Sequence, residues 1–377
     1  MYENFRTKEL AVPTLFDPFS LKGATLRNRI AVSPMCQYSA ADGVVNDWHL
    51  SHLAGLARGG AGLVTVEATA VSPEGRISPG CLGLWDDEQA KALAPAVDLI
   101  KSAGAVAGIQ LAHAGRKGSA NLPWEGDDHI PDDDPRGWPT ISPSAVPLGG
   151  GLGKVPTEMT LADIARVRAD FVSAAERARD LGFEWLNLHF AHGYLAQSFL
   201  SRHANQRTDS YGGSRENRAR FLVETLRAVR EVWPQDRPLT VRLGVIEFDG
   251  DDERTLTESI ETARELKQEG MDLLDVSMGF STVDSQIPWG PAMLGPYAGR
   301  VREEAGVPTS TSWRIRTPQQ AEELVSTGKV DLVVLGTALL AEPHWPFRAA
   351  RELGVPAPAT TTLPVQYAHW LSRYDGA

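Results

Sequence analysis

Two histidines and a tyrosine lie within six residues, in the segment His189-Phe190-Ala191-His192-Gly193-Tyr194. They follow a short apolar run, Trp185 to Leu188, which predicts a buried strand. A strand end can direct such side chains into one pocket above a rigid scaffold. An imidazole donates a hydrogen bond to a carbonyl or nitro oxygen, and a phenol delivers a proton. The spacing therefore favours catalysis by His189, His192 and Tyr194 over two structural histidines beside a core aromatic.

The bulk composition narrows the class of protein. The 377 residues fit two average domains or one large α/β barrel. A formal net charge of −11 argues against nucleic acid or an anionic membrane as a partner. The two cysteines, Cys36 and Cys81, exclude a disulfide scaffold and suit a reducing cytoplasm. The polar start MYENFRTKELAVP and the lack of long apolar stretches predict a cytoplasmic globular protein with no membrane span.

Short apolar runs alternate with amphipathic helical stretches along the chain. The predicted strands are 29–33, 62–67, 106–111, 185–188, 239–243, 273–277, 307–312 and 331–335. The predicted helices are 48–60, 87–103, 161–181, 214–232, 255–269, 297–305, 318–327 and 344–353. Eight strand–helix units in a row predict an α/β fold, a (β/α)8 TIM barrel. A doubly wound sheet would need a split in the series, and no linker supplies one.

The chain is predicted to form one domain, residues 1–377. The barrel core spans about 15–354, and a tail follows from 355 to 377. Three tail aromatics, Tyr367, Trp370 and Tyr374, need a surface to pack on. An irregular segment from His113 to about Met159, rich in Pro, Gly, Asp and Trp, is predicted to be a long functional loop.

Polar residues gather where the predicted strands end, which is where TIM barrels place their chemistry. Gln110 can pair with an amide-like edge, and Arg242 can hold negative charge on a ring. Loops after strands seven and eight are the usual phosphate cradle of this fold. These features describe a planar, phosphorylated cofactor, and flavin mononucleotide (FMN) fits. The strand-end residues are Ser33, Pro34, Met35, Cys36, Gln37, Tyr38, Glu67, Ala68, Thr69, Gln110, His113, Arg242, Ser277, Trp313, Arg314, Gly336 and Thr337.

Plainer interpretations remain for several of these residues. Cys36 alone can be a small buried hydrophobe, and Arg242 can be a salt-bridge residue. Gly149 to Gly153 (GGGLG) does not lie between a strand and a helix, so it indicates a flexible loop. His189, His192 and His203 suggest zinc, but no carboxylate or cysteine completes a set at familiar spacing, so no metal is expected.

Several longer motifs are more specific. They are SPMCQY, VEATAVSPEGRI, QLAHAGRK, HFAHGYLAQSFLS, RTDSYGGSRENR and EPHW. With them the chain resembles, over nearly its whole length, the Old Yellow Enzyme family of FMN-dependent ene-reductases. The match is to its bacterial branch of xenobiotic reductase A-like proteins.

The resemblance implies an activity. NADPH or NADH reduces FMN and leaves, and an alkene conjugated to a carbonyl or nitro group then takes hydride from the flavin. His189 and His192 would bind the activating oxygen, and Tyr194 would protonate the α-carbon. Two alternatives stay open: reduction of nitrate esters or nitroaromatics on the same flavin, and a non-catalytic barrel that binds FMN weakly.

The resemblance also assigns roles around the flavin. Cys36 would lie beside the ring, Tyr38 over the substrate, and Trp313 in the pocket wall. Trp370 would reach the neighbour's site, which implies a homodimer or larger homo-oligomer. The flavin-ring contacts would be Ser33, Pro34, Met35, Cys36, Ala68, Gln110 and Arg242. The loops after strands seven and eight would add the cofactor contacts Trp313, Arg314, Gly336 and Thr337.

Two loops depart from the family pattern. Gly336-Thr337 stands where the family has Gly-Arg, whose arginine grips the phosphate. The segment from Trp313 to Pro318 reads WRIRTP where the family has WGFGTP. Our hypothesis is that Arg314 or Arg316 supplies the missing positive charge, because an arginine–phosphate contact is charge-assisted.

Overall fold

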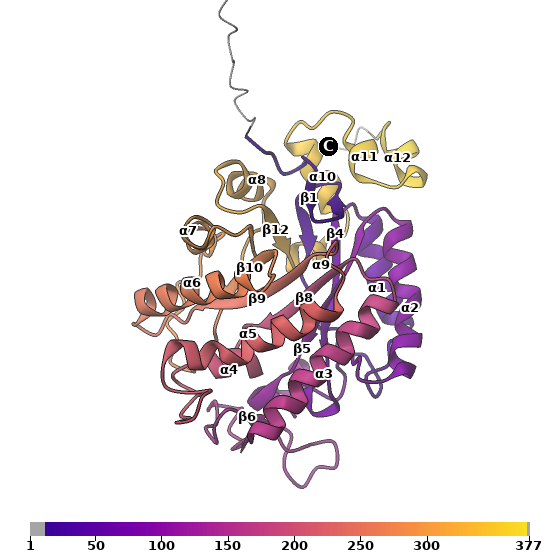
Figure 1. The fold of residues 1–377 in the computed structure, drawn as a ribbon. Coiled ribbons are helices and arrows are strands. Elements are labelled where there is room, and N and C mark those ends of the chain that lie inside the picture. Colours follow the sequence, from indigo (N-terminus) through magenta and orange to yellow (C-terminus); the bar gives the residue numbers. More distant parts are fainter. Residues whose placement is uncertain (1–11, 375–377) are drawn as a thin grey trace, which may run out of the picture.

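Eight parallel strands close into a barrel in the computed structural model, which describes residues 12–374 (Figure 1). Around the barrel the order is β10-β11-β12-β3-β4-β5-β8-β9. The sequence predicted all eight strands, and the (β/α)8 fold is confirmed. The start of the chain, residues 1–11, lies outside the described residues. The strands are β3 Ile30–Val32, β4 Leu63–Ala70, β5 Val106–Ala112, β8 Trp185–Phe190, β9 Leu239–Ile246, β10 Leu273–Met278, β11 Thr309–Thr311 and β12 Leu332–Leu335.

Helices cover the outside of the barrel, one after each strand (Figure 1). Their bounds lie within about three residues of the predicted ones, and α6 shows the largest difference, beginning at Asp252. The helices that follow the strands are α1 Asp47–Arg58, α2 Asp87–Ser102, α3 Leu161–Asp180, α5 Arg215–Val232, α6 Asp252–Gln268, α7 Gly295–Ala305, α8 Pro318–Ser326 and α10 Trp345–Glu352.

Helix α3 shows how the sequence sets these elements. Thr160 Oγ1 accepts from the Asp163 backbone N at 3.1 Å, and an Asp163 carboxylate oxygen accepts from the Thr160 backbone N at 2.9 Å. This capping box satisfies two donors at the helix start. Val167, Phe171 and Ala178 recur on one face and are buried against the barrel. The helix ends at Asp180, just before Gly182, whose φ is +85°.

A hairpin closes the amino-terminal end of the barrel. Strands β1 (Phe19–Leu21) and β2 (Ala24–Leu26) pair antiparallel. Their apolar side chains pack against residues near the starts of the barrel strands, so this end is filled with hydrocarbon. The cluster consists of Phe19, Ala24, Leu26, Ala31, Leu63, Trp185, Leu273, Leu332 and Val334.

The segment 113–159 is mostly irregular, as predicted. It contains two short turns of 3-10 helix, Gly115–Lys117 and Pro123–Glu125, and two-residue strands β6 (Ile141–Ser142) and β7 (Thr157–Glu158). Arg116, in the first of these turns, is fully buried. It donates to the carbonyl oxygens of Val146, Pro147 and Ser281. These bonds tie the loop to the segment after β10 at the carboxyl end of the barrel.

Four short helices were not predicted. Helix α4 (Leu195–Leu200) follows Tyr194, and α9 (Thr337–Ala341) follows β12. The tail contains α11 (Pro358–Thr362) and α12 (Val365–Leu371), drawn in yellow in Figure 1. They bury a small cluster of Phe347, Ala359, Leu363 and Ala368, while Trp370 stays 70% exposed and Tyr374 56% exposed.

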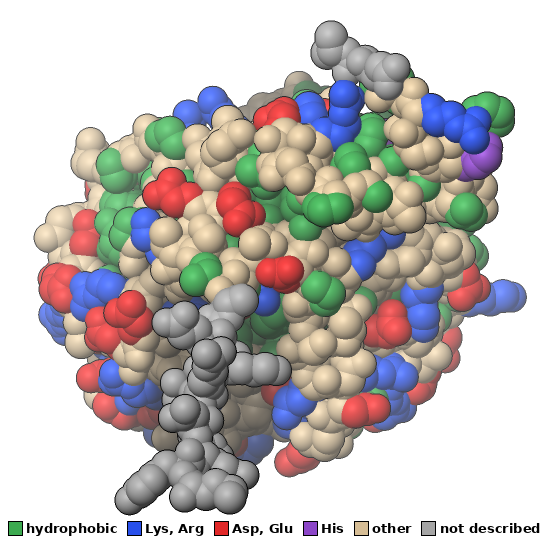
Figure 2. All heavy atoms as spheres, turned by 90° about the horizontal axis from the view of Figure 1, so that it is seen from above, with side chains coloured by type: hydrophobic (Ala, Val, Ile, Leu, Met, Phe, Trp, Pro, Cys, Tyr) green, Lys and Arg blue, Asp and Glu red, His purple; other side chains and the backbone are tan. Residues whose placement is uncertain are grey.

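The surface carries both signs of charge. On the face seen in Figure 2, acidic and basic side chains are interspersed around scattered hydrophobic groups. Among residues 12–374, no helix is long and apolar enough to cross a membrane.

Candidate active site

His189 lies inside β8, because that strand runs two residues further than predicted, to Phe190. The Ala191 backbone N donates to His189 Nδ1 at 3.4 Å. Burial and the nearby positive charge of Arg242 hold the pKa of this imidazole well below its usual value, so the ring is neutral. A neutral ring that accepts at Nδ1 carries its proton on Nε2, which makes Nε2–H a hydrogen-bond donor.

His192 is displayed by a strained turn. Its φ is +62°, and Gly193 follows with φ of +70°. A Cβ on residue 193 would stand 2.3 Å from the carbonyl oxygen of Phe280, so only glycine fits there. The His192 ring centroid lies 4.8 Å from that of His189 and 5.8 Å from that of Trp313. Burial lowers the pKa of His192 as well, so two neutral imidazoles stand side by side.

Tyr194 completes the group. Its ring centroid is 5.0 Å from that of His189 and 6.2 Å from that of His192. Burial raises the pKa of its phenol well above the usual value, so the hydroxyl keeps its proton. The structure therefore brings His189, His192 and Tyr194 together, as the sequence predicted.

Lys117 belongs to the same group and was not singled out from the sequence. Its ammonium donates to the His192 carbonyl oxygen at 2.9 Å and lies 5.3 Å from the Tyr194 ring centroid. Burial lowers the pKa of Lys117 to about 8. The available signal was its place at the end of the motif QLAHAGRK, which begins in β5 and continues into the loop after it.

A cavity of about 490 Å³ opens beside His192 at the carboxyl ends of the strands. This volume lies in the usual range of small-molecule sites, roughly 300–1,000 Å³. Most of its lining residues were predicted to contact FMN, and Arg316 is also among them. The cavity is lined by Ser33, Pro34, His192, Arg242, Trp289, Ser312, Trp313, Arg314, Ile315, Arg316, Val334, Gly336 and Thr337.

Four predicted flavin contacts lie outside this lining. Ala68 is in register with Gln110 across β4 and β5, and Gln110 donates to the Asn187 side-chain oxygen at 2.7 Å. Burial, followed by the negative charge of Glu67, raises the pKa of the Cys36 thiol, so it stays protonated. A Cβ at Gly336 would lie 3.5 Å from Met35 Sδ, which places Met35 next to the cavity wall.

Arg242 forms a salt bridge, which the sequence left open as the alternative to ligand binding. Its Nε lies 3.2 Å from an Asp275 carboxylate oxygen, and its Nη2 donates to Ser312 Oγ at 2.8 Å. Both side chains of the ion pair are buried inside the barrel. Arg242 also lines the cavity, so it is a fixed positive charge available to a ligand there.

The predicted substrate-binding residues are spread more widely. Tyr38 has a φ of +51°, and its ring meets the ring of Trp124 edge-on at 5.9 Å. Trp313 lines the cavity, with a φ of +70°. Trp370 belongs to α12 and is not among the residues lining this cavity.

The donor set fits FMN better than a metal. The cavity combines three guanidinium groups, from Arg242, Arg314 and Arg316, with the Ser312 hydroxyl. Guanidinium groups suit a phosphate and an electron-rich ring. In the described part of the chain, no group of three or more His, Cys, Asp or Glu is arranged to hold a metal ion.

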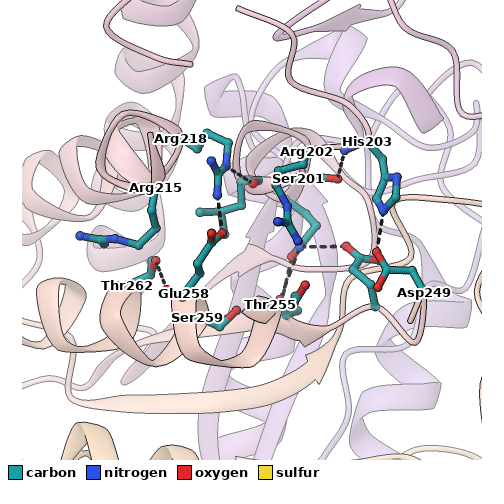
Figure 3. Close-up of a pocket in the computed structure, with 14 residues that line it drawn as sticks. Ser201, Arg202, His203, Arg215, Arg218, Asp249, Thr255, Glu258, Ser259 and Thr262 are labelled. Carbon is teal, nitrogen blue, oxygen red and sulfur yellow. Dashed lines mark hydrogen bonds and ion pairs between the residues drawn. The ribbon is translucent and has the colours of Figure 1, made fainter. Parts of the chain in front are cut away.

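A second, narrower cavity of about 40 Å³ lies against α4, α5 and α6 (Figure 3). Its basic side chains already have carboxylate partners. Arg218 pairs with Glu258, Arg202 with Asp251 at 2.8 Å, and His203 with Asp249 at 2.6 Å. The network connects these helices, and its cavity is far below the size of a flavin site.

The chain belongs to a flavin oxidoreductase family. Residues 14–355 match the model of the "NADH:flavin oxidoreductase / NADH oxidase family", to which the Old Yellow Enzymes belong. A curated relative from Geobacillus thermodenitrificans, "NADPH dehydrogenase", is 44% identical over 355 residues, or 94% of this chain and 97% of the relative. A Listeria innocua relative of the same name is 41% identical over 94% of this chain and 98% of its own.

Solved structures agree with the family. Morphinone reductase superposes with a TM-score of 0.76 at 26% identity, covering 96% of each chain. An Old Yellow Enzyme homologue from Zymomonas mobilis superposes with a TM-score of 0.76 at 26% identity, covering 94% of this chain and 99% of its own. The chain is therefore an oxidoreductase with FMN as cofactor and a reduced nicotinamide as hydride donor.

Proposed function

We propose that this protein is an NADPH-dependent reductase of C=C bonds conjugated to a carbonyl or nitro group. The observation that carries the proposal is the grouping of two neutral imidazoles with a protonated tyrosine, in which His192 lines the cavity and His189 and Tyr194 lie against His192. Neutral imidazoles donate hydrogen bonds without placing full charge on the substrate. FMN, when bound, supplies the hydride chemistry between nicotinamide and substrate.

The protein's own residues bind the substrate, stabilise its developing charge and supply the proton. His189 and His192 bind the activating oxygen and stabilise the enolate-like charge that develops there. Tyr194 keeps its phenolic proton and delivers it to the α-carbon. Arg242 is the fixed positive charge at the cavity, and Trp313 forms part of its wall. Tyr38 and Cys36 lie outside this lining and would contact the substrate from the segment after β3.

The alternatives differ in support. The same two imidazoles would serve a nitro or nitrate ester oxygen, so reduction of such compounds belongs to the same test. The non-catalytic barrel rests only on the changed loops at Arg314 and Thr337. Membership of an oxidoreductase family and the grouping of His189, His192 and Tyr194 argue against it.

Two further features are part of the proposal. The free thiols of Cys36 and Cys81 support a cytoplasmic location. The exposed aromatic Trp370 supports a homodimer in which α12 approaches the neighbouring cavity.

The test separates the two half-reactions of Tyr194→Phe by stopped-flow spectroscopy without oxygen. We expect the flavin to be reduced by NADPH at nearly the native rate. Reoxidation by 2-cyclohexenone should slow by about 100-fold or more, because a positioned general acid contributes about 10²–10⁴-fold. Equal loss in both half-reactions would remove Tyr194 from this role. A native protein that reoxidises only with nitroaromatics would replace the proposed substrate class.

A further inference from the structure

Ser277 links the second histidine to the loop after β11. It is the next-to-last residue of β10 and is fully buried. Its Oγ lies 2.7 Å from His192 Nε2 and 3.0 Å from Trp313 Nε1. An indole N–H can only donate, so Trp313 occupies one lone pair of the Ser277 oxygen.

The Ser277 hydroxyl can also donate one hydrogen bond. In residues 12–374 the recorded partners of Ser277 Oγ are His192 and Trp313, and of these only the imidazole can accept. If His192 Nε2 donated as well, the hydroxyl proton would be buried without an acceptor, which is unfavourable. The balanced arrangement is donation from Ser277 Oγ to His192 Nε2.

We propose that Ser277 is a positioning residue that fixes the ring proton of His192 on Nδ1, and so selects the atom of this histidine that binds substrate. His192 is neutral and has one ring proton. With Nε2 engaged as an acceptor, Nδ1–H remains as the donor. His189 offers Nε2–H instead, so the two imidazoles use different nitrogen atoms.

The surroundings of His192 keep the ring in this orientation. Its backbone N donates to the Met278 carbonyl oxygen at 3.1 Å, and its own carbonyl oxygen accepts from Lys117. The rings of Phe280 and Trp313 pack against it at 5.7 and 5.8 Å. Within the described chain, neither His189 Nε2 nor His192 Nδ1 has a hydrogen-bond partner, so both can donate to a ligand.

The first test reads the tautomer directly, in FMN-loaded protein with 15N-labelled histidine. Two-bond proton–nitrogen correlations distinguish a protonated ring nitrogen from a bare one, and His192→Gln identifies the His192 signals. We expect protonated Nδ1 and bare Nε2 in the native protein, and partial protonation of Nε2 in Ser277→Ala. A native His192 protonated on Nε2, or an unchanged pattern in Ser277→Ala, would overturn the proposal.

The second test measures binding of 2-cyclohexenone to the oxidised protein from the change in flavin absorption. Ser277→Ala should weaken binding about five- to tenfold, the usual effect of one hydrogen bond. Ser277→Thr, which keeps the hydroxyl, should restore most of it. Thr311→Val is the matched control, because it removes a buried hydroxyl bonded to the neighbouring Val276 carbonyl oxygen at 3.0 Å, and it should bind normally. Loss in Thr311→Val equal to that in Ser277→Ala would count against the proposal.

This inference deepens the proposed function, because it assumes that the two imidazoles bind the substrate oxygen. The tautomer measurement does not depend on turnover. A native protein with His192 protonated on Nδ1 that fails to reduce alkenes would contradict the proposed function and leave the role of Ser277 in place.

Discussion

Glu67 is a buried carboxyl group that contacts segment 33–38, which is predicted to bind the flavin. It accepts from the Gln37 backbone N at 3.1 Å, and His49 Nε2 lies 3.6 Å from its other oxygen. Burial raises the pKa of Glu67 to about 8, while burial lowers the pKa of His49 to about 4. At neutral pH the group is therefore mostly protonated, and it ionises in mildly alkaline solution.

This shift predicts how stability depends on pH. Between the usual carboxyl pKa of 4.5 and about 8, the folded state holds a proton that the unfolded chain has lost. The contribution of Glu67 to the free energy of unfolding therefore falls as pH rises through that window. Glutamine cannot ionise, so the free energy of unfolding of Glu67→Gln should rise relative to that of the native protein between pH 5 and pH 8.5. The expected rise is on the order of a few kcal/mol.

Urea denaturation of both proteins at several pH values measures this difference. Glu231→Gln, which removes an exposed carboxylate on α5, is the control and should show little change. A constant difference between Glu67→Gln and the native protein across the range would show that the folded state does not hold the extra proton.

Among single residues, the sequence predicted those functional side chains that lie close together in one short segment. The His189 to Tyr194 group was found because its three side chains lie within six residues. Ser277 was noted only as a strand end, and Lys117 was not singled out. Their contacts with His192 join residues 85 and 75 positions apart, and no local pattern carries such a contact.

We expect the loop from Trp313 to Pro318 to hold the cofactor phosphate. Trp313 and Arg314 both adopt positive φ, at +70° and +56°, where the family pattern has at least one glycine. Arg314 lies over the Trp289 ring at 5.1 Å. The Arg316 backbone is fixed by Gln320 Oε1 and by Trp345 Nε1, while its side chain lines the cavity.

We therefore expect Arg316 to contribute more than Arg314 to FMN retention. Arg316→Ala should weaken FMN binding about tenfold or more, since a charged hydrogen bond is worth roughly 1.5–3 kcal/mol. Arg314→Ala should have a smaller effect, because that guanidinium already lies on Trp289. Fluorescence titration of the FMN-free protein measures both, with the exposed Arg254→Ala as control. Unchanged FMN affinity in both variants would contradict the hypothesis that Arg314 or Arg316 replaces the arginine that the family has at position 337.

Among the elements, the eight strands were predictable because each is an apolar run bounded by turn residues. The additional helices were not, because α4, α9, α11 and α12 have five to seven residues each. A helix that short is stabilised by its tertiary contacts rather than by its own periodicity. The hairpin β1–β2 was also not predicted, because each of its strands has three residues.

For the whole molecule, the exposed apolar side chains of α12 and of Tyr374, which follows it, predict self-association. Trp370, Val365 and Tyr374 are 70%, 74% and 56% exposed. Sedimentation equilibrium should show a dimer, and Trp370→Ala should weaken it about tenfold or more, as buried tryptophans do at interfaces. Val155→Ala, which removes an equally exposed apolar side chain from segment 113–159, should leave the dimer intact. A monomeric native protein would refute the predicted role of Trp370.

The hairpin that fills the amino-terminal end of the barrel also bears on how reactants enter the protein. Because Phe19 and Leu26 pack at that end, we expect nicotinamide and alkene both to reach the cavity from the carboxyl-end face. Two reactants that use the same cavity must bind in turn, so steady-state rates should follow ping-pong kinetics, in which an excess of either reactant obstructs the other.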